Sequence, residues 1–455
     1  MTHMNRREFA VQAGKITIAS MGGIMALSAL NTRKALGAND RINMALIGCG
    51  GRGRQVMKGL VSHGAQLVCA CDVNEHHRRN TAAEFQTLQN RPVKTDIEMR
   101  RVFEDKDVDA VLVATPEHWH ALATVWACQA GKDVYVEKNP TISIWEGQKM
   151  IEAAQKYQRI VQVGFQNRSA PYARSARAYI ASGKLGKIVH VKSYNMLGGG
   201  HWRARSDTAI PAGLDWDRWL GPAREVPYNA NRHSMNGRGG WGSYWDYSGG
   251  TLADDASHVL DLARLVLGDP GHPHGVYHSG GNLAFGSKRE TPEMQCITYD
   301  FPDFTWTCES STFAPYMSKT SGKIRQGNMF PVWAQNATRT EIYGTQAMMY
   351  LGRHGGGWQV VEKEGKVAAF DYGHVPDQEH QPNFLTCIKT RKQPNGHIQE
   401  AHHSACLVHL GNLAYRAGNR HLIFNGDSET FVNSDEANAL IKPHARDHYR
   451  IPDIV

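Results

Sequence analysis

The sequence predicts an α/β domain with a doubly wound parallel sheet, followed by an α+β domain built on a large, mostly antiparallel sheet. Three observations lead to this prediction. An apolar strand runs into a glycine-rich turn at residues 41–53, strands and helices then alternate up to residue 164, and after residue 185 strand-like segments follow without long helices between them. Alternation indicates parallel strands, and consecutive strands indicate antiparallel pairing. We therefore predict domains at 39–165 and 166–455, preceded by a leader at 1–38.

The glycine-rich turn has the spacing G-x-G-x-x-G at Gly48, Gly50 and Gly53. In a Rossmann fold the first glycine allows a sharp turn, the second lets a pyrophosphate approach the backbone, and the third lets helix and strand pack closely. Phosphates then lie on the unpaired N–H groups of the helix start, where the helix dipole favours negative charge. We expect Gly51 and Arg52, in the same turn, to belong to this cofactor site.

The second strand, at 64–72, ends in Asp72, which lies 24 residues after Gly48. A dinucleotide fold needs a carboxylate at this place for the ribose hydroxyls. Because a carboxylate repels a 2′-phosphate, we expect NAD rather than NADP, although the nearby Arg78 and Arg79 weaken this preference. The alternative is a parallel α/β domain that binds no dinucleotide.

The alternation continues with a strand at 107–116, a helix from 117 to 130, a strand at 132–138, a helix at 144–157 and a strand at 159–164. Ligands of such sheets bind at the carboxyl ends of the strands. Gly48, Asp72, Thr115 and Lys138 all fall at strand ends, so we expect them at one edge of the sheet.

In the second half, strands are expected at 187–194, 284–285, 294–299, 305–311, 340–343, 348–351 and 357–362, with a helix at 401–417. The segment 198–249 is a loop-rich insertion crowded with aromatic residues: Trp202, Trp216, Trp219, Trp241, Tyr244 and Trp245. These side chains either pin a long loop to the surface or form a stacking wall for a sugar ring, and both can hold at once. Trp245 is our candidate substrate contact.

The N-terminus resembles a twin-arginine export signal. Arg6-Arg7 precedes a mildly apolar stretch at 16–30, and small residues suited to cleavage follow at 35–38; a basic N-terminal helix is the alternative. We therefore expect a periplasmic protein, exported folded, whose NAD is loaded beforehand and stays bound. Without residues 1–38 the formal charge falls from +8 to about +4, with no dense basic tract, so nucleic-acid binding is not indicated. No apolar run in this remainder is long enough to span a membrane.

None of the eight cysteines forms a C-x-x-C pair, which argues against zinc or thioredoxin chemistry. Cys69 and Cys71 share one face of a strand and are expected in the core. A disulfide between Cys296 and Cys308 is conceivable in an oxidising compartment.

Asp254 and His258 are four residues apart at the start of an apolar helix, so they share one face, which Asp261 extends by a turn. An acid beside a histidine can orient and tune it for proton transfer. The alternative is an N-capping Asp and a half-buried His. Lys138 is placed to bond a reacting hydroxyl, or else to pair with Glu137 on the surface. The histidines at 118, 120, 402 and 403 lack the carboxylate and spacing of familiar zinc sites, so we expect no catalytic metal.

Together these motifs resemble the glucose–fructose oxidoreductase, inositol dehydrogenase and rhizopine catabolism (Gfo/Idh/MocA) family, over essentially all of 40–455. The residues are the glycine turn, the segments 114–120 and 135–138, Gly249-Gly250 with Asp254 and His258, and the late segments 383–385 and 409–415, which are similar to an exported branch. The resemblance implies an open antiparallel sheet on which the substrate rests, and a homo-oligomer.

The resemblance also implies roles for single residues. Lys138 would contact the reacting oxygen, His258 would be the acid–base and Asp254 would position substrate or histidine. Further cofactor contacts would come from Thr115, Pro116, His118 and Glu137, and further substrate contacts from Gln166 and Arg168 near the domain junction.

Two departures from the family pattern are present. Glu137-Lys138 is followed by Asn139 and only then Pro140, so the cis peptide associated with this lysine is not expected, because cis bonds are essentially confined to proline. The glycine that commonly stands two residues before the histidine is Ala256.

The resemblance implies hydride exchange at a sugar, glycoside or polyol carbon. An alternative is a redox-neutral glycosidase or lyase, in which the sugar is oxidised, eliminates its aglycone and is reduced again. The Glu137-Lys138 pair argues against that alternative, because such enzymes usually lack it. A third hypothesis is a dinucleotide-loaded binding protein without activity.

Overall fold

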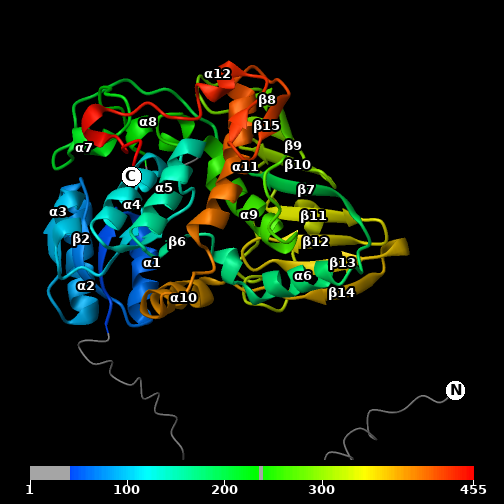
Figure 1. Cartoon of the computed structure of the whole chain (residues 1–455), viewed down its shortest axis with the longest axis horizontal. Helices are drawn as coiled ribbons and strands as arrows, with labels where there is room; N and C mark the ends of the chain where they lie inside the picture. The colour runs from blue at the N-terminus through cyan, green and yellow to red at the C-terminus, as the bar shows by residue number, and fades with distance from the viewer. Residues whose placement is uncertain (1–40, 235–238) are drawn as a thin grey trace, which may run out of the picture. The chain divides into compact units, whose positions relative to one another are not determined.

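A computed structural model describes residues 41–234 and 239–455, and the predicted leader lies outside these residues (Figure 1). The first sheet has six parallel strands in the order β3-β2-β1-β4-β5-β6. The strands are β1 (Asn43–Ile47), β2 (Gln66–Cys71), β3 (Lys94–Asp96), β4 (Ala110–Val113), β5 (Asp133–Val136) and β6 (Val161–Val163). The predicted Rossmann fold is thus confirmed, with β3 as an addition that the sequence pattern did not indicate.

Helices cover both faces of this sheet, which explains why its strands are almost continuously apolar. Along β1, Ala45 and Ile47 point toward α3 (Met99–Glu104), α4 (His120–Gln129) and α5 (Ile144–Lys156). Met44 and Leu46 point to the other face, toward α1 (Gly51–Ser62) and α2 (Glu75–Gln89). That face is completed by α10 (Asp377–Thr390), which lies beside α1 although it comes from the last quarter of the chain (Figure 1).

The second sheet has ten strands in the order β14-β13-β12-β11-β7-β10-β9-β8-β15-β16. In the described residues, β7 and β10 form its one parallel pair, and the sheet is otherwise antiparallel, as predicted. The strands are β7 (Ile188–Met196), β8 (Gly275–Gly281), β9 (Met294–Asp300), β10 (Thr305–Ser311), β11 (Arg339–Gly344), β12 (Met348–Gly352), β13 (Gly357–Val361), β14 (Val367–Asp371), β15 (Leu422–Asn425) and β16 (Thr430–Phe431).

The sequence pattern was misleading at both margins of this sheet. The expected strand at 284–285 is irregular chain, and β8, β14, β15 and β16 were not predicted. β8 carries glycines at both ends, and β14 is exposed along much of its length, so neither shows the alternation by which a half-buried strand is recognised.

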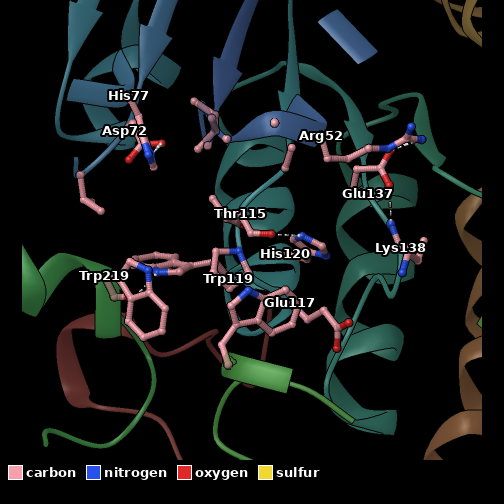
Figure 2. A pocket seen from close by; sticks show the side chains of 18 of the residues that line it. Arg52, Asp72, His77, Thr115, Glu117, Trp119, His120, Glu137, Lys138 and Trp219 are labelled. Carbon is pink, nitrogen blue, oxygen red and sulfur yellow. Dashed lines mark hydrogen bonds and ion pairs between the residues drawn. The ribbon is translucent and has the colours of Figure 1, made fainter. Parts of the chain in front are cut away.

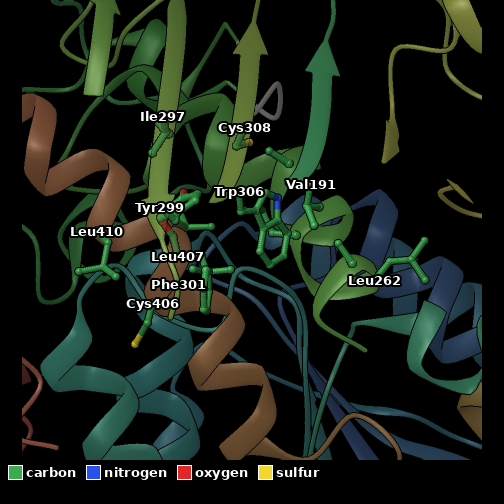
Figure 3. Packing of buried hydrophobic residues seen from close by; sticks show 14 of the residues in the cluster. Val191, Leu262, Ile297, Tyr299, Phe301, Trp306, Cys308, Cys406, Leu407 and Leu410 are labelled. Carbon is green, nitrogen blue, oxygen red and sulfur yellow. The ribbon is translucent and has the colours of Figure 1, made fainter. Parts of the chain in front are cut away.

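One face of the ten-stranded sheet packs on the helices α6 (Pro171–Ala181), α9 (Ser257–Val266) and α11 (Ile398–Arg416). Trp306 is fully buried at the centre of this core, where its Nε1 donates to Ser193 Oγ at 3.0 Å (Figure 3). Tyr299 donates its hydroxyl to the Leu407 carbonyl of α11 at 2.7 Å. These bonds satisfy the polar ends of two large aromatic side chains inside an apolar layer.

The aromatic insertion forms a separate apolar cluster around α7 (Trp216–Leu220), close to α8 (Ala230–His233). Trp216 and Trp219 stack with ring centroids 4.6 Å apart, and Tyr228 and Tyr247 meet them edge-on. These four aromatic rings therefore hold the insertion together, in agreement with the structural interpretation. A further short helix, α12 (Asp435–Asn438), follows β16.

All eight cysteines are free thiols, and Cys69 and Cys71 are buried as expected. The conceivable Cys296–Cys308 disulfide is excluded by strand register. Cys296 on β9 faces Glu309 on β10, while Cys308 faces Ile297. Because side chains alternate between faces along a strand, the two sulfurs point to opposite sides of the sheet. Within 41–234 and 239–455, no helix is long and apolar enough to cross a membrane.

Candidate active site

A cavity of about 550 Å³ lies at the carboxyl ends of β1, β2, β4 and β5 and extends to the start of α9. Its volume is in the range of small-molecule and cofactor sites. It brings together twelve of the residues that the sequence singled out: Gly48, Gly50, Gly51, Arg52, Asp72, Thr115, Pro116, Glu137, Lys138, Gln166, Asp254 and His258. Figure 2 shows that the labelled members come from several strand ends and converge on one space.

The glycine turn forms one end of the cavity. Gly48 has φ +91°, and a Cβ built there would lie 2.6 Å from the Ala114 carbonyl oxygen, so the turn and β4 can approach only without a side chain. At the helix start, no side chain of the described residues caps the backbone at Gly50. A Cβ at Gly51 would meet nothing within 4 Å. This open helix N-terminus is suited to a phosphate.

Asp72 directly follows β2 at the same edge and is held in place by backbone donors. Its Oδ2 accepts from the Cys49 N–H at 2.7 Å and its Oδ1 accepts from the Asn74 N–H at 2.8 Å. Arg78 reaches the Asp72 carbonyl at 3.3 Å, while Arg79 pairs with Glu75 on the exposed side of α2. Neither arginine lines the cavity. The carboxylate therefore remains the group that a ribose would meet at this edge.

Lys138, at the end of β5, pairs with Asp254. Its Nζ donates to Asp254 Oδ1 at 2.8 Å and to the Asp254 carbonyl at 2.7 Å. Glu137 instead binds Arg52 of α1 at 3.0 Å (Figure 2). The alternative pairing of Lys138 with Glu137 is therefore not found. Burial lowers the pKa of Lys138, but the carboxylates of Asp254, Asp255 and Glu117 outweigh it, so the pKa is raised and the ammonium is charged.

His258 follows a π-helical turn, Leu252–Ala256, that precedes α9. The imidazole is buried against Phe165, with ring centroids 5.8 Å apart. Burial, together with the positive charges of Arg353 and Lys138, lowers the pKa of His258 well below its usual range. The ring is therefore neutral at neutral pH and able to accept a proton. Among the described residues its Nδ1 has no hydrogen-bond partner.

The peptide bond between Lys138 and Asn139 is cis, contrary to the expectation from the missing proline. Asn139 is fully buried, its carbonyl oxygen lies 2.7 Å from His120 Nδ1, and its side chain donates to the Thr141 carbonyl at 2.8 Å. Tertiary contacts thus hold a conformation that the sequence rule for X–Pro bonds does not anticipate.

Four of the proposed residues do not line the cavity. Gly53 packs against the Gly48 carbonyl, where a Cβ would lie 2.3 Å away. His118 is buried under the aromatic insertion, with its Nε2 3.1 Å from the Trp219 carbonyl. Trp245 lies beside Tyr415 and Arg416.

Arg168 is the fourth of these residues, and it is buried in an ion pair. It binds Asp261 at 2.6 Å and Asp269 at 3.0 Å. Asp261 therefore does not extend the face of Asp254 and His258 into the cavity. It anchors α9 to the segment that follows β6.

Sequence reasoning missed several residues that do line the cavity, among them Glu117, Trp119, Arg353 and His354. Trp219 and Trp241, which the sequence offered as part of a stacking wall, also line it. Glu117 is buried, which raises its pKa to about 7 even though Lys138 opposes the shift. The sequence feature that could have identified Glu117 is its position in the segment 114–120, which belongs to the family resemblance. Arg353 comes from the β12–β13 turn and is held by Asp255 at 2.5 Å. Nothing in a pattern of antiparallel strands indicates which turn reaches the cavity.

The residues present fit a dinucleotide. The open helix start offers N–H groups to a pyrophosphate, Asp72 offers a carboxylate to a ribose, and Thr115 Oγ1 is buried at the cavity without a partner among the described residues. At the other end lie a charged lysine and a neutral histidine. This pairing suits removal of a hydroxyl proton while negative charge on the oxygen is stabilised.

Comparisons with known proteins agree with the fold and with an NAD-binding Rossmann domain. The model of the oxidoreductase family with an NAD-binding Rossmann fold (GFO_IDH_MocA) matches residues 42–165, and that family's C-terminal α/β domain matches 176–278 and 358–451. The scyllo-inositol 2-dehydrogenase (NAD(+)) of Bacillus subtilis is 24% identical over 367 residues, which cover 78% of this chain and 88% of that protein.

Two solved structures share the fold. A levoglucosan dehydrogenase in complex with NADH and levoglucosan superposes with a TM-score of 0.61 at 16% identity, covering 87% of this chain and 100% of that one. The aldose–aldose oxidoreductase from Caulobacter crescentus, complexed with glycerol, superposes with a TM-score of 0.59 at 18% identity, covering 84% and 100%.

Proposed function

The chain belongs to the Gfo/Idh/MocA family of NAD-binding oxidoreductases, and on this premise we propose that it exchanges a hydride between NAD and a hydroxyl-bearing carbon of a sugar, glycoside or polyol in carbohydrate breakdown. The observation that carries the proposal is the juxtaposition of the Lys138–Asp254 pair and the neutral His258 in a cavity that also contains the glycine turn and Asp72. Relatives and structural neighbours named for inositol, levoglucosan and aldoses support the substrate class.

Each residue of the site has a separate role in such a reaction. NAD, when bound, supplies the ring that takes or returns the hydride. Burial and nearby positive charges lower the pKa of His258, so the ring is neutral and has a free lone pair with which to take the hydroxyl proton. Its Nδ1 is without a partner among the described residues. Lys138 stabilises the negative charge that develops on the oxygen, and Asp254 holds the ammonium in place. Gln166 and Arg353 lie at the same cavity and are candidates for substrate hydroxyls.

Substitution of the two central residues tests this assignment. We expect Lys138→Met and His258→Asn each to lower kcat by about 10²–10⁴-fold, the usual contribution of acid–base groups, while NAD binding is retained. Initial rates with a panel of sugars and polyols, followed at the absorbance of NADH, measure the effect. Lys106→Met and His444→Asn are matched controls at exposed positions and should leave the rate unchanged. Full activity in either cavity variant would refute the roles of Lys138 and His258.

Product analysis separates this function from the redox-neutral glycosidase. A keto sugar or lactone is expected if the protein is an ordinary or coupled oxidoreductase. Free reducing sugar and aglycone, with no net change in NADH, would instead establish the oxidation–elimination–reduction cycle. Neither product in the wild type, together with retained NAD binding, would favour a binding protein.

We also propose that residues 1–38 are a twin-arginine signal and that the mature protein works in the periplasm with NAD tightly bound. The support is the Arg6-Arg7 pair, the apolar stretch that follows it and the small residues at 35–38. Cell fractionation of the wild type and of an Arg6→Lys/Arg7→Lys variant tests export. Mass analysis of nucleotide released by denaturing protein purified without added cofactor tests retention; protein free of nucleotide would contradict tight binding.

A homo-oligomer is the remaining proposal. The strands β7, β11, β12, β13 and β14 are neighbours in the second sheet. Residues paired directly across these strands share one face of the sheet: Lys192, Glu341, Tyr350, Gln359 and Phe370. Trp333 covers Tyr350 on this face, but Phe370 is 53% exposed, so the face presents apolar area to solvent at its β14 edge. Light scattering coupled to size exclusion should give a multiple of the chain mass, and a monomer at micromolar concentration would contradict the proposal.

A further inference from the structure

A cluster of metal-ligating side chains lies apart from the cavity. Its centre is formed by His272, Cys406 and Glu429, and His402 lies beside Cys406 and Glu429; none of the four lines the cavity. His402 and Cys406 are one turn apart on α11, so they share a helix face. His272 comes from the loop before β8, and Glu429 comes from the turn between β15 and β16. Figure 3 shows Cys406 on α11, at the margin of the core around Trp306. Three segments distant in sequence thus contribute one cluster.

The donor atoms are close together. Ligand atoms of His272, Cys406 and Glu429 lie within 4.8 Å of one another. Glu429 Oε1 lies 2.9 Å from His272 Nε2 and 2.7 Å from His402 Nε2. Cys406 Sγ lies 3.5 Å from His402 Nε2 and 3.9 Å from Glu429 Oε1. Bond lengths of about 2.0–2.3 Å place neighbouring ligands of a tetrahedral zinc ion about 3.3–3.8 Å apart. Movements of less than about 1 Å would convert the two hydrogen bonds into this spacing.

The cluster is shielded from water and directed inward. The side chains of His272, His402 and Glu429 are 9%, 2% and 11% exposed, and Cys406 is fully buried. Glu429 adopts φ 51°, a left-handed conformation that a non-glycine residue takes at a cost. Such conformations concentrate at functional positions. Gln148 of α5 donates to Glu429 Oε2 at 2.7 Å, which fixes the carboxylate and leaves Oε1 for the cluster.

We propose that His272, His402, Cys406 and Glu429 bind one zinc ion in a closed tetrahedral site. Thiolate, imidazole and carboxylate together favour zinc over magnesium or calcium, which prefer oxygen ligands alone. On binding, each imidazole coordinates through Nε2 with its proton on Nδ1, the Sγ–Zn bond forms, and the thiol proton passes to solvent without any redox change. The ion ties α11 to the β15–β16 turn and to the loop before β8, and its role is structural.

The test is metal analysis of the full chain produced in zinc-supplemented medium, with Cys406→Ser compared against Cys387→Ser. Cys387 is also a buried helical thiol, but it lies on α10 outside the cluster. Mass spectrometry should find one zinc per chain in the wild type and in Cys387→Ser, and a loss of at least tenfold in Cys406→Ser. Cobalt added to the zinc-free wild type should give a thiolate-to-metal charge-transfer band, which Cys387→Ser retains and Cys406→Ser lacks.

Several outcomes would overturn the proposal. Zinc-supplemented wild type without stoichiometric metal would do so, and so would zinc that Cys406→Ser retains in full. If Cys406→Ser does not fold, the cobalt band of the wild type decides alone, because a spectrum without a thiolate transition excludes Cys406 as a ligand. His272→Ala, in the loop before β8, is the second variant and should weaken zinc retention in the same assay.

Discussion

At the scale of single residues, the charges around Lys138 decide the chemistry of the cavity. Asp254 is its direct partner, at 2.8 Å, and Glu117 is a second, buried carboxyl whose charge acts on it. Glu117 is itself 2% exposed and receives a long bond from the Gly249 N–H at 3.4 Å. Burial raises the pKa of Glu117 to about 7, so this carboxyl titrates close to neutral pH.

The titration of Glu117 predicts a pH-dependent stability. Burial raises its pKa from 4.5 to about 7 in the folded protein, so the folded state holds a proton that the unfolded state has lost between these pH values. This contribution to stability is complete below pH 4.5 and disappears as the pH rises through 7. Glu117→Gln removes the titration, so its stability relative to the wild type should rise between about pH 5 and 8 by on the order of 3 kcal/mol.

Urea unfolding of wild type and Glu117→Gln at about pH 5 and about pH 8 measures this change. Glu364→Gln is the matched control, because its side chain is 83% exposed and the difference from wild type should not vary with pH. A pH-independent difference for Glu117→Gln as well would contradict the raised pKa.

At the scale of elements, the turn from β1 to α1 determines whether a phosphate can approach. The turn is glycine-dependent for two separate reasons at Gly48, its positive φ and its contact with the β4 backbone. The π-helical turn Leu252–Ala256 has a comparable role at the opposite end of the cavity, where it presents Asp254 while α9 presents His258. Single π-turns inside helices occur often at functional sites.

Gly48→Ala and Gly131→Ala separate the two effects at the turn. Both positions have positive φ, but a Cβ at Gly131 meets nothing within 4 Å, whereas at Gly48 it meets the Ala114 carbonyl at 2.6 Å. We expect Gly131→Ala to cost about 1–2 kcal/mol of stability with unchanged NAD affinity. Gly48→Ala should cost more and weaken NAD binding at least tenfold. Calorimetric titration and urea unfolding provide both values, and equal NAD affinity in the two variants would refute a phosphate cradle at this turn.

At the scale of the whole molecule, late segments of the chain complete early ones. α10 packs on the nucleotide-binding sheet, with Phe384 fully buried edge-on to Tyr135 of β5 at 5.7 Å between ring centroids. Ile398 and Ala401 of α11 belong to the core on the opposite face of that sheet. The parallel sheet is therefore covered by helices from both halves of the sequence.

This arrangement predicts that a change in α10 destabilises the nucleotide-binding part. Phe384→Ala should lower the free energy of unfolding by about 3–5 kcal/mol, the usual penalty for removing an aromatic side chain from a core. The variant should therefore lose NAD binding at a lower urea concentration than the wild type. Phe285→Ala removes the same side chain from the segment between β8 and β9, where it is 38% exposed, and should cost about 1 kcal/mol. Similar costs for the two variants would mean that α10 is not part of the cooperative core.

Local patterns in the sequence were enough to predict the parallel sheet, the glycine turn and the place of Asp72, Thr115 and Lys138 at one edge. They were enough because these features depend on local periodicity and on the rule that parallel strands end at the same edge. The mostly antiparallel character of the second sheet could also be predicted, from strands that follow one another without long helices.

Which side chains meet became known only from the folded chain. Lys138 could pair with its neighbour Glu137, but folding brings it to Asp254, 116 residues away, and brings Glu137 to Arg52. His118 and Arg168 look equivalent to the cavity residues in the sequence, yet one is buried under the insertion and the other in an ion pair. Local patterns likewise gave no sign that Arg353 lines the cavity or that Glu429 lies beside His402. The free energy of such contacts depends on burial and on distance in space, which no local pattern encodes.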